Sequence, residues 1–297
     1  MNEGAVDPSS RPLRFAVVGF PLARTQSPAM HTAAYRDLKL PHSYEAIPAT
    51  RDELPRLFAS LRDGVYEGFN VTVPHKKSVL DLVDEIDASA AMAEAANTIV
   101  RGVDGRLCAF NTDTGALADE LRDLAPERGP RWQGVSALVL GTGGAARAAV
   151  IALSVDLGVA SIHVRGRRIA TDETAHALTA LVRRAGSTTT IVARPLEADR
   201  EIDASLAAVV QATSAGMTGA DSGETLTRAV DFAAMGDRAV ALDVVYAPLR
   251  TPFLDAAEAR GLRRANGLGM LARQGARAFE LWLKVPAPYG AMRAAIG

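Results

Sequence analysis

The sequence predicts an α/β protein built from two domains, the second of which contains a doubly wound parallel sheet. Three observations predict this architecture. The 297 residues fit two domains of ordinary size better than one. From Val135 onward, short apolar runs alternate with stretches of helical spacing. A glycine-rich turn at residues 141–144 joins the first of those runs to the helix that follows it.

The composition favours a small-molecule ligand over a nucleic acid or a membrane. The 33 lysines and arginines nearly balance the 34 aspartates and glutamates, so there is no basic excess to attract phosphate backbones or anionic lipids. No apolar run approaches the roughly 18 residues of a membrane span. Cys108 is the only cysteine, which excludes an intrachain disulfide and a cysteine-built metal cluster. We therefore expect a cytoplasmic protein without a metal site.

The first half of the chain begins with a polar stretch, residues 1–12, in which we expect a flexible tail. A buried strand is predicted over Arg14–Gly19, and Ser27 and Pro28 are typical of the N-cap and the first position of a helix. The loop between them carries the hydroxyls of Thr25 and Ser27. These hydroxyls either cap the helix or hold a carboxylate.

A polar face is predicted further along, at the end of a strand. Tyr66–Val73 alternates so that Asn70 and Thr72 share one face, and Lys76 follows at the expected start of a helix. Polar side chains at a strand end can line a cleft, whereas an isolated lysine is most often solvated. Both interpretations of Lys76 stay open on these residues alone.

A hairpin and a helix close the first half. Asp104-Gly105 lies between the apolar runs 96–101 and 107–110, which is a strong turn signal. Asp113 follows the second run closely, at the start of an amphipathic helix. It either caps this helix or faces the same cleft as Lys76.

The glycine-rich turn has the context of a dinucleotide site. The run Val135–Leu140 predicts a strand, and the alanine-rich stretch that follows the glycines predicts a helix. Gly141 permits a tight turn, and Gly143 permits the close approach of a ligand. The backbone N–H groups at the start of the helix, around Gly144 and Ala145, would then face an anion such as a pyrophosphate.

The remainder of the second half predicts βαβ units in a parallel sheet. Strands are expected at residues 137–140, 161–165, 189–192, 207–212 and 238–245. Asp255–Arg260 has helical spacing, and Gly267 precedes a last helix over Leu271–Leu283.

A cluster of arginines predicts which dinucleotide binds. NAD sites carry an acidic residue near the end of the second strand, where it holds the adenosine ribose. Here Arg165, Arg167 and Arg168 stand at that strand end instead. Because guanidinium groups bind phosphate through paired hydrogen bonds, the sequence favours NADP, with its ribose 2′-phosphate, over NAD.

Taken in order, these motifs resemble those of the shikimate dehydrogenase family, from Val17 to Trp282. The stretches that carry the resemblance are the glycine turn, the arginine cluster, 68–76 (GFNVTVPHK), 96–98 (ANT), 111–113 (NTD), 212–217 (ATSAGM) and 267–274 (GLGMLARQ). The resemblance implies the reversible, NADP-dependent reduction of 3-dehydroshikimate to shikimate, a step of aromatic amino acid biosynthesis. It also implies a Rossmann-like nucleotide domain.

The resemblance further implies how the chain is divided. Residues 13–112 and 267–297 would form the substrate domain, because the family's C-terminal helix packs back on the first domain. Residues 113–266 would form the NADP domain, with the cofactor between the two. We expect a monomer or a homodimer.

Site residues follow from the resemblance one by one. Lys76 and Asp113 would be the catalytic pair, since a lysine ammonium can donate a proton and stabilise developing negative charge. The substrate would be bound at its ring hydroxyls by Asn70, Thr72, Asn97 and Gln274, and at its carboxylate by Thr25, Ser27 and Tyr246. The cofactor would contact Gly141, Gly143, Gly144, Ala145, Arg165, Arg167, Arg168, Thr213 and Gly267.

Three places depart from the family pattern. Arg24-Thr25 replaces the usual His-Ser of the first loop, His75 replaces an aromatic or apolar residue, and Gln211 replaces an asparagine. The methyl group of Thr25 narrows the site, so the possibility of a paralogue that oxidises quinate or an amino analogue of shikimate stays open.

A non-catalytic dinucleotide-binding sensor would have no need of Lys76 and Asp113. A folate dehydrogenase would give no reason for the motifs at 68–76 and 111–113 to occur together.

Overall fold

The structure, a computed structural model, describes residues 11–22, 25–129, 132–167, 169, 171–197 and 206–297. The expected tail, apart from residues 11 and 12, lies outside the described residues, as do Arg24 and Arg168. The chain divides into two compact units. Unit 1 comprises residues 1–112 and 271–297, and unit 2 comprises residues 113–270. The first boundary coincides with the expected one, and the second lies four residues later.

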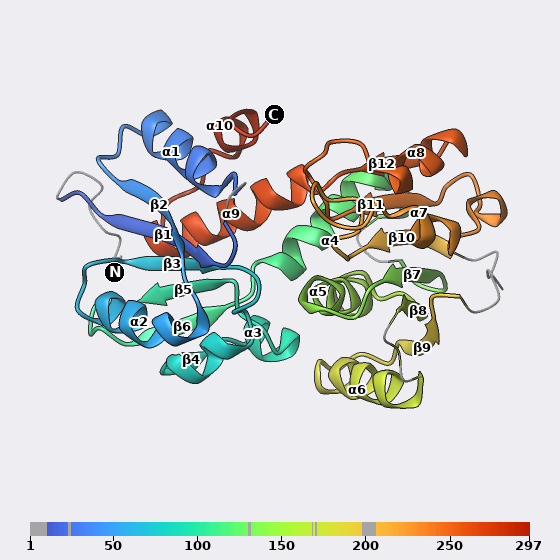
Figure 1. Cartoon of the computed structure of the whole chain (residues 1–297), viewed down its shortest axis with the longest axis horizontal. Coiled ribbons are helices and arrows are strands. Elements are labelled where there is room, and N and C mark those ends of the chain that lie inside the picture. The colour runs from blue at the N-terminus through green and yellow to red at the C-terminus, as the bar shows by residue number, and fades with distance from the viewer. Residues whose placement is uncertain (1–10, 23–24, 130–131, 168, 170, 198–205) are drawn as a thin grey trace. The chain divides into compact units, whose positions relative to one another are not determined.

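Unit 1 is a six-stranded mixed sheet with helices (Figure 1). The strand order is β2-β1-β3-β5-β6-β4, in which β1 is parallel to β2 and β3, and β5 is antiparallel to β3 and β6. The strands are β1 (Arg14–Gly19), β2 (Ser43–Pro48), β3 (Gly68–Val71), β4 (Glu85–Ile86), β5 (Thr98–Arg101) and β6 (Leu107–Phe110). The helices are α1 (Ser27–Asp37), α2 (Leu54–Arg62), α3 (Ala88–Ala93), α9 (Leu268–Leu283), which begins in unit 2, and α10 (Tyr289–Ala294), with short 3₁₀ turns at Arg51–Glu53 and Ser78–Leu82.

Helix α9 is fixed to this sheet by a fit between a glycine and a tryptophan. A Cβ atom on Gly68 would lie 2.1 Å from Nε1 of Trp282, so only glycine at this position leaves room for the indole. The same Nε1 donates a hydrogen bond of 3.0 Å to the carbonyl of Ile99 in β5. Strands β3 and β5 of unit 1 are therefore attached to a helix residue that lies 214 residues after Gly68 and 183 residues after Ile99.

Unit 2 is a six-stranded, wholly parallel sheet in the order β12-β11-β10-β7-β8-β9. The chain enters at β7 in the middle, builds outward through β8 and β9, then returns to β10 beside β7, which is the Rossmann-like arrangement. The strands are β7 (Ser136–Leu140), β8 (Ser161–Gly166), β9 (Thr190–Pro195), β10 (Leu206–Gln211), β11 (Val240–Asp243) and β12 (Arg263–Ala265). The helices are α4 (Asp113–Leu124), α5 (Gly144–Ile151, continued as a π-helical turn over Ala152–Leu157), α6 (Thr171–Arg184), α7 (Glu224–Arg228) and α8 (Pro252–Ala259), with 3₁₀ turns at Pro126–Arg128 and Phe232–Ala234.

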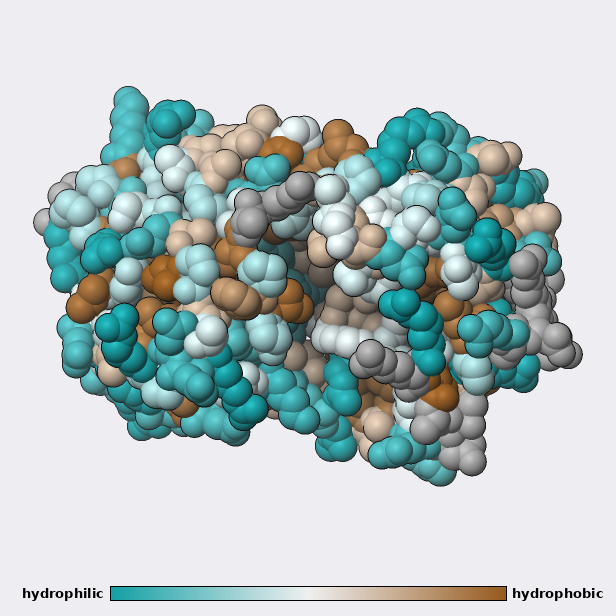
Figure 2. Space-filling view, in the orientation of Figure 1, coloured by the Kyte–Doolittle hydropathy of each residue, from teal (hydrophilic) through white to brown (hydrophobic). Residues whose placement is uncertain are grey.

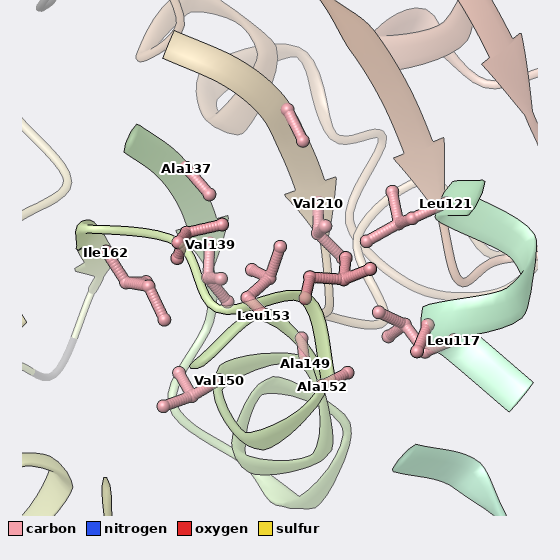
Figure 3. Packing of buried hydrophobic residues seen from close by; sticks show 14 of the residues in the cluster. Leu117, Leu121, Ala137, Val139, Ala149, Val150, Ala152, Leu153, Ile162 and Val210 are labelled. Carbon is pink, nitrogen blue, oxygen red and sulfur yellow. The ribbon is translucent and has the colours of Figure 1, made fainter. Parts of the chain in front are cut away.

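The core of unit 2 lies between the middle strands and two helices. Figure 3 shows Val139 of β7 and Val210 of β10 facing Leu153, with Leu117 and Leu121 of α4 beside them. All five side chains are buried without exposed surface. Burying such side chains stabilises the fold by roughly 1.5–3 kcal/mol each. This packing therefore fixes the position of β7, from whose end the glycine turn begins.

The structure corrects several sequence-based expectations. Helix α1 begins at Ser27 with Gln26 as its N-cap, and no side chain caps it, so Ser27 is inside the first turn instead of before it. Lys76 lies in a turn two residues before the 3₁₀ segment at Ser78, and does not begin a helix. The predicted hairpin is confirmed, with Gly105 at φ +81°, a conformation that favours glycine. Strands β4 and β12 and helices α7 and α10 were not expected.

No helix in the described part of the chain is both long enough and apolar enough to cross a bilayer. On the face shown in Figure 2, hydrophilic residues predominate and apolar residues are scattered among them.

Candidate functional site

A buried network of amides and hydroxyls in unit 1 joins three of the expected substrate ligands. Asn97 donates from Nδ2 to Oγ1 of Thr112 at 2.9 Å and to Oε1 of Gln274 at 3.3 Å. In return, the backbone N–H of Thr112 donates to Oδ1 of Asn97 at 2.8 Å. Asn97 therefore holds the end of β6 and helix α9 together, and its amide orientation is fixed by partners on both sides.

Asn70 continues this network from the neighbouring strand. Its Nδ2 donates to the carbonyl of Asn97 and to Oγ1 of Thr98, both at 3.2 Å. Its Oδ1 accepts a hydrogen bond of 2.7 Å from the hydroxyl of Tyr44. The structure thus brings Asn70, Asn97 and Gln274 together, and it adds Tyr44, Thr98 and Thr112, to which no role was assigned from the sequence.

The backbone around Asn97 also locates the two expected catalytic residues. The N–H of Ala96 donates to the carbonyl of Lys76 at 2.7 Å, so the lysine backbone lies beside the residue that precedes Asn97. Asp113 follows Thr112 directly and is buried at the first position of α4. Lys76 is half-buried. The backbone of Lys76 is therefore held by the residue before Asn97, and Asp113 follows a residue that Asn97 itself holds.

The two hydroxyls of the first loop lie next to each other. Oγ1 of Thr25 donates to Oγ of Ser27 at 3.3 Å, and the N–H of Ser27 donates to Oγ1 of Thr25 at 3.4 Å. Thr72 lies beyond the end of β3, where its methyl group would be 2.4 Å from a Cβ atom on Gly19. Glycine at position 19 thus permits the close approach of Thr72 to β1.

His75 is accommodated by the protein backbone. Its ring is buried, and Nε2 lies 2.7 Å from the carbonyl oxygen of Ala49. This unusual residue before Lys76 is therefore engaged with the end of strand β2.

The glycines in the turn of unit 2 differ in how much space surrounds them. Gly141 has φ +119°, and a Cβ atom there would lie 2.9 Å from the carbonyl oxygen of Ala212, so a side chain is excluded. Gly143 is the N-cap of α5, and a Cβ atom on it or on Gly144 would meet nothing within 4 Å. The space above the first turn of α5, which continues to Ala145, is thus open on the side where N–H groups and the helix dipole favour an anion.

The arginines at the end of β8 differ in environment. Arg165 is buried, and its Nη1 donates to the carbonyl of Ala229 at 2.9 Å. Arg167 is exposed, and its Nη1 lies 3.3 Å from a carboxylate oxygen of Asp221, which is also exposed. An exposed ion pair of this kind contributes little, about 0–1 kcal/mol. The guanidinium of Arg167 can exchange this partner for a phosphate.

The last expected ligands stand on loops at the carboxyl edge of the same sheet. Thr213 follows β10, and its Oγ1 accepts a hydrogen bond of 3.0 Å from the N–H of Ala215. Tyr246 follows β11 and is half-buried, and burial raises the pKa of its hydroxyl. A Cβ atom on Gly267 would lie 2.1 Å from the carbonyl oxygen of Val244, so glycine is required there. In open α/β sheets this edge is where ligands bind.

The sequence did not identify the residues that form hydrogen bonds to the expected site residues and hold them or their loops in position. Tyr44 gave no signal, because a tyrosine on an alternating strand is usually a core residue. Asp243 gave a usable one, since it is an acidic residue at the end of an otherwise apolar strand. Among the described residues, no group of three or more histidines, cysteines and acids is arranged to hold a metal ion.

Known proteins are similar in sequence to this chain over most of its length. A family model described as the shikimate dehydrogenase substrate binding domain matches residues 17–99, and one described as the shikimate 5'-dehydrogenase C-terminal domain matches residues 267–296. A shikimate dehydrogenase (NADP(+)) of Sinorhizobium fredii is 38% identical over 269 residues, which cover 90% of this chain and 87% of the relative.

Solved structures extend the likeness to the fold. Shikimate 5-dehydrogenase from Thermus thermophilus, in complex with NADP(H) and shikimate, has a TM-score of 0.78 at 35% identity and covers 96% of this chain and 98% of its own. Quinate dehydrogenase from Corynebacterium glutamicum, in complex with NAD, has a TM-score of 0.81 at 27% identity, with 96% and 98% covered. The family models, the extent of identity and the shared fold lead to one conclusion: this chain belongs to the shikimate dehydrogenase family.

Proposed function

We propose that this protein catalyses the reversible, NADP-dependent reduction of 3-dehydroshikimate to shikimate. The observation that carries the proposal is the buried network around Asn97, which joins Asn70, Thr112 and Gln274. A ring with several hydroxyl groups needs amides and hydroxyls at fixed positions, because any missing partner leaves a buried polar group unpaired. Membership of the shikimate dehydrogenase family supports the same substrate.

The carboxylate of the substrate is assigned to the first loop. Thr25 and Ser27 present two hydroxyls within 3.3 Å of each other, and hydroxyl donors bind carboxylates through charge-assisted hydrogen bonds. Thr25 carries a methyl group that a serine lacks. For this reason quinate, whose ring is substituted differently, is the second candidate substrate.

The residues of unit 2 fit NADP. The open space beside Gly143 and Gly144 suits a pyrophosphate at the start of α5. Arg167 is the arginine we assign to the ribose 2′-phosphate, because Arg165 is buried against the carbonyl of Ala229. When bound, NADP supplies the two-electron chemistry that a side chain cannot provide.

The chain's own contribution to the chemistry is proton transfer. We assign to Lys76 the donation of a proton to the ketone oxygen as charge develops there, and to Asp113 the support of that proton transfer. In the reverse direction Lys76 accepts the proton of the alcohol. We also propose a cytoplasmic location, which suits the single cysteine, and a monomer or homodimer as the working state.

The direct test is a substrate panel. Purified protein is mixed with shikimate, quinate or aminoshikimate, each with NADP or NAD, and the absorbance of the reduced nicotinamide is followed. Fastest turnover with shikimate and NADP is expected. Preference for quinate or the amino analogue would move the substrate assignment to that compound, and no turnover with any pair would end the proposal.

A second test concerns Lys76. The Lys76→Ala variant is expected to lose at least about a hundredfold in kcat, the lower range of general acid catalysis, while its affinity for NADP stays near that of the parent. Lys77→Ala is the matched control, because this neighbouring lysine is exposed. Equal turnover of the two variants would remove Lys76 from the mechanism.

A further inference from the structure

Asp243 is a buried acid for which the proposed function provides no role. It ends strand β11 and has no exposed surface. Directly beside it in the parallel register, Gln211 ends strand β10 and is also buried. Nε2 of Gln211 donates to Oδ1 of Asp243 at 3.2 Å. The two strand ends are therefore joined by their side chains at the edge of the sheet where ligands bind.

Asp243 fixes both ends of the segment that carries Tyr246. Its Oδ1 accepts a hydrogen bond of 2.9 Å from the N–H of Val245, and its Oδ2 accepts one of 2.6 Å from Oγ1 of Thr251. Tyr246 lies between these two attachment points. Its backbone position is thus set by the carboxylate of Asp243.

Gln211 does the same for the loop after β10. Its Oε1 accepts a hydrogen bond of 2.5 Å from the N–H of Thr213, and its Nε2 donates to the carbonyl of Ala215 at 2.9 Å. Thr213 is one of the residues assigned to the cofactor. A single amide therefore holds this loop in a tight turn and at the same time contacts Asp243.

The two loops are also in direct contact with each other. The N–H of Thr218 donates to the carbonyl of Ala247 at 3.1 Å. A Cβ atom on Gly216 would lie 3.2 Å from the methyl group of Thr251, so the loops pack without a gap at this point. Displacement of one loop would therefore displace the other.

A purely structural role does not account for the polar character of this pair. Burial raises the pKa of Asp243 to about 6, although hydrogen bonds from Thr251 and Val245 oppose this effect. Burying a carboxyl group costs free energy, most of all when it is ionised, and apolar residues of similar volume are often at least as stable at such positions. What the polar pair adds is a defined orientation of two loops.

We propose that Gln211 and Asp243 are positioning residues that hold Thr213 and Tyr246 in the orientation required for NADP and for shikimate. The inference rests on the proposed function, because it takes the ligands of Thr213 and Tyr246 from there. Gln211 acts on the cofactor side, Thr251 acts through Asp243 on the substrate side, and Asp243 couples the two.

The experiment uses variants that keep side-chain volume. Gln211→Met removes both polar atoms of the amide, and Thr251→Val removes only the hydroxyl. Thr251→Ser retains that hydroxyl. Ser136→Ala is the control, because Ser136 makes a partly buried hydrogen bond of 2.8 Å to Ser161 at the opposite, amino-terminal edge of the same sheet. For each variant, kcat, both KM values, the affinity for each ligand by calorimetry, and Tm are measured.

The expected result is a split between the two KM values. Gln211→Met is expected to raise KM for NADP about tenfold, and Thr251→Val to raise KM for shikimate about tenfold, as for the loss of a buried hydrogen bond. Thr251→Ser is expected to match the parent. In the double variant, which combines Gln211→Met with Thr251→Val, the losses in kcat/KM are expected to be less than multiplicative, because both side chains contact Asp243.

Three results would overturn the inference. In the first, Gln211→Met and Thr251→Val lower Tm but leave both KM values and both affinities equal to those of Ser136→Ala. In the second, Thr251→Ser is as impaired as Thr251→Val, and in the third, the losses in the double variant are fully multiplicative. Failure of the proposed function is distinguishable, since the parent protein itself would then not turn over shikimate. In that case unchanged NADP affinity in Gln211→Met still overturns the inference, and a tenfold loss supports it.

Discussion

At the scale of single residues, His31 links burial to acid sensitivity. It is wholly buried in unit 1, and its ring stacks on Tyr44 with centroids 4.2 Å apart. Burial lowers its pKa from 6.5 to about 3, and the nearby Asn70 side chain offsets only part of this effect. Below pH 6.5 the imidazole of His31 binds a proton in the unfolded chain, whereas in the folded protein it stays neutral down to a pH of about 3. The contribution of His31 to stability is therefore complete above pH 6.5 and is lost as the pH falls toward 3, by about 1.4 kcal/mol per pH unit.

We predict that His31→Phe, which retains a stacked ring, removes the part of the pH dependence of stability that His31 causes. Asp243 works in the opposite direction, because its pKa is raised to about 6. Its contribution is complete at low pH and is lost as the pH rises through 6. The two groups partly cancel between pH 4 and 6, so the variant should become less stable with rising pH relative to the parent. Urea unfolding at half-unit pH steps measures this, and parallel curves for the two proteins would refute it.

Arg167 carries a prediction about cofactor choice. Arg167→Ser is expected to raise KM for NADP about 10- to 150-fold, as for the loss of a charged hydrogen bond worth ~1.5–3 kcal/mol. KM for NAD should change little, because NAD lacks the 2′-phosphate. Arg228→Ala is the control, since Arg228 is similarly exposed and also paired with an acid, Glu224. If both KM values rose together in Arg167→Ser, the 2′-phosphate would have to be bound elsewhere.

At the scale of elements, the turn between β7 and α5 separates two functions of glycine. Gly141→Ala forces a side chain against Ala212 at φ +119°, and should cost about 1–3 kcal/mol of stability. Gly143 has φ −79° and open space around it, so Gly143→Ala should fold normally yet bind NADP more weakly. Chemical denaturation and NADP titration of both variants provide the measurements. Equal stability of the two variants would contradict this interpretation of the turn.

The elements that could be predicted from the sequence are those with a long apolar signal. The expected and observed strands agree at Arg14–Gly19, and those of unit 2 up to β10 agree within a few residues. Strand β12 (Arg263–Ala265) could not be found, because its pattern is two arginines and an alanine, and only its pairing with β11 makes it a strand. Strand β4 has two exposed residues and no pattern at all. Short edge elements depend on their neighbours and not on their own composition.

The site was only partly predictable for a related reason. Spacing along the chain placed Asn70 and Thr72 at one strand end, but nothing local joins Asn97 to Gln274, 177 residues away. Only the resemblance to the family suggested that these two act together. The supporting hydroxyl of Tyr44 and the pair formed by Gln211 and Asp243 become apparent only when the strands assemble into sheets, since their hydrogen bonds join different strands.

At the scale of the whole molecule, the two units should respond to different ligands. NADP alone is expected to slow hydrogen exchange at the amides of residues 141–147 and 165–167 in unit 2. Shikimate alone is expected to slow exchange at residues 70–76 and 97–98 in unit 1. Mass spectrometry of exchanged peptides measures both effects. The assignment of ligands to units would fail if each ligand protected the other unit's peptides first.

Unit 1 is encoded in two pieces, and this has a consequence for how the protein is made. Residues 113–270 of unit 2 are contiguous, so that unit can finish folding as soon as they emerge from the ribosome. The strands of unit 1 are synthesised before unit 2, yet the indole of Trp282, which fills the space over Gly68, is synthesised only after the whole of unit 2. Unit 1 is thus begun before unit 2 and completed after it. Chains interrupted before α9 would display an unfinished apolar sheet to the cell's chaperones.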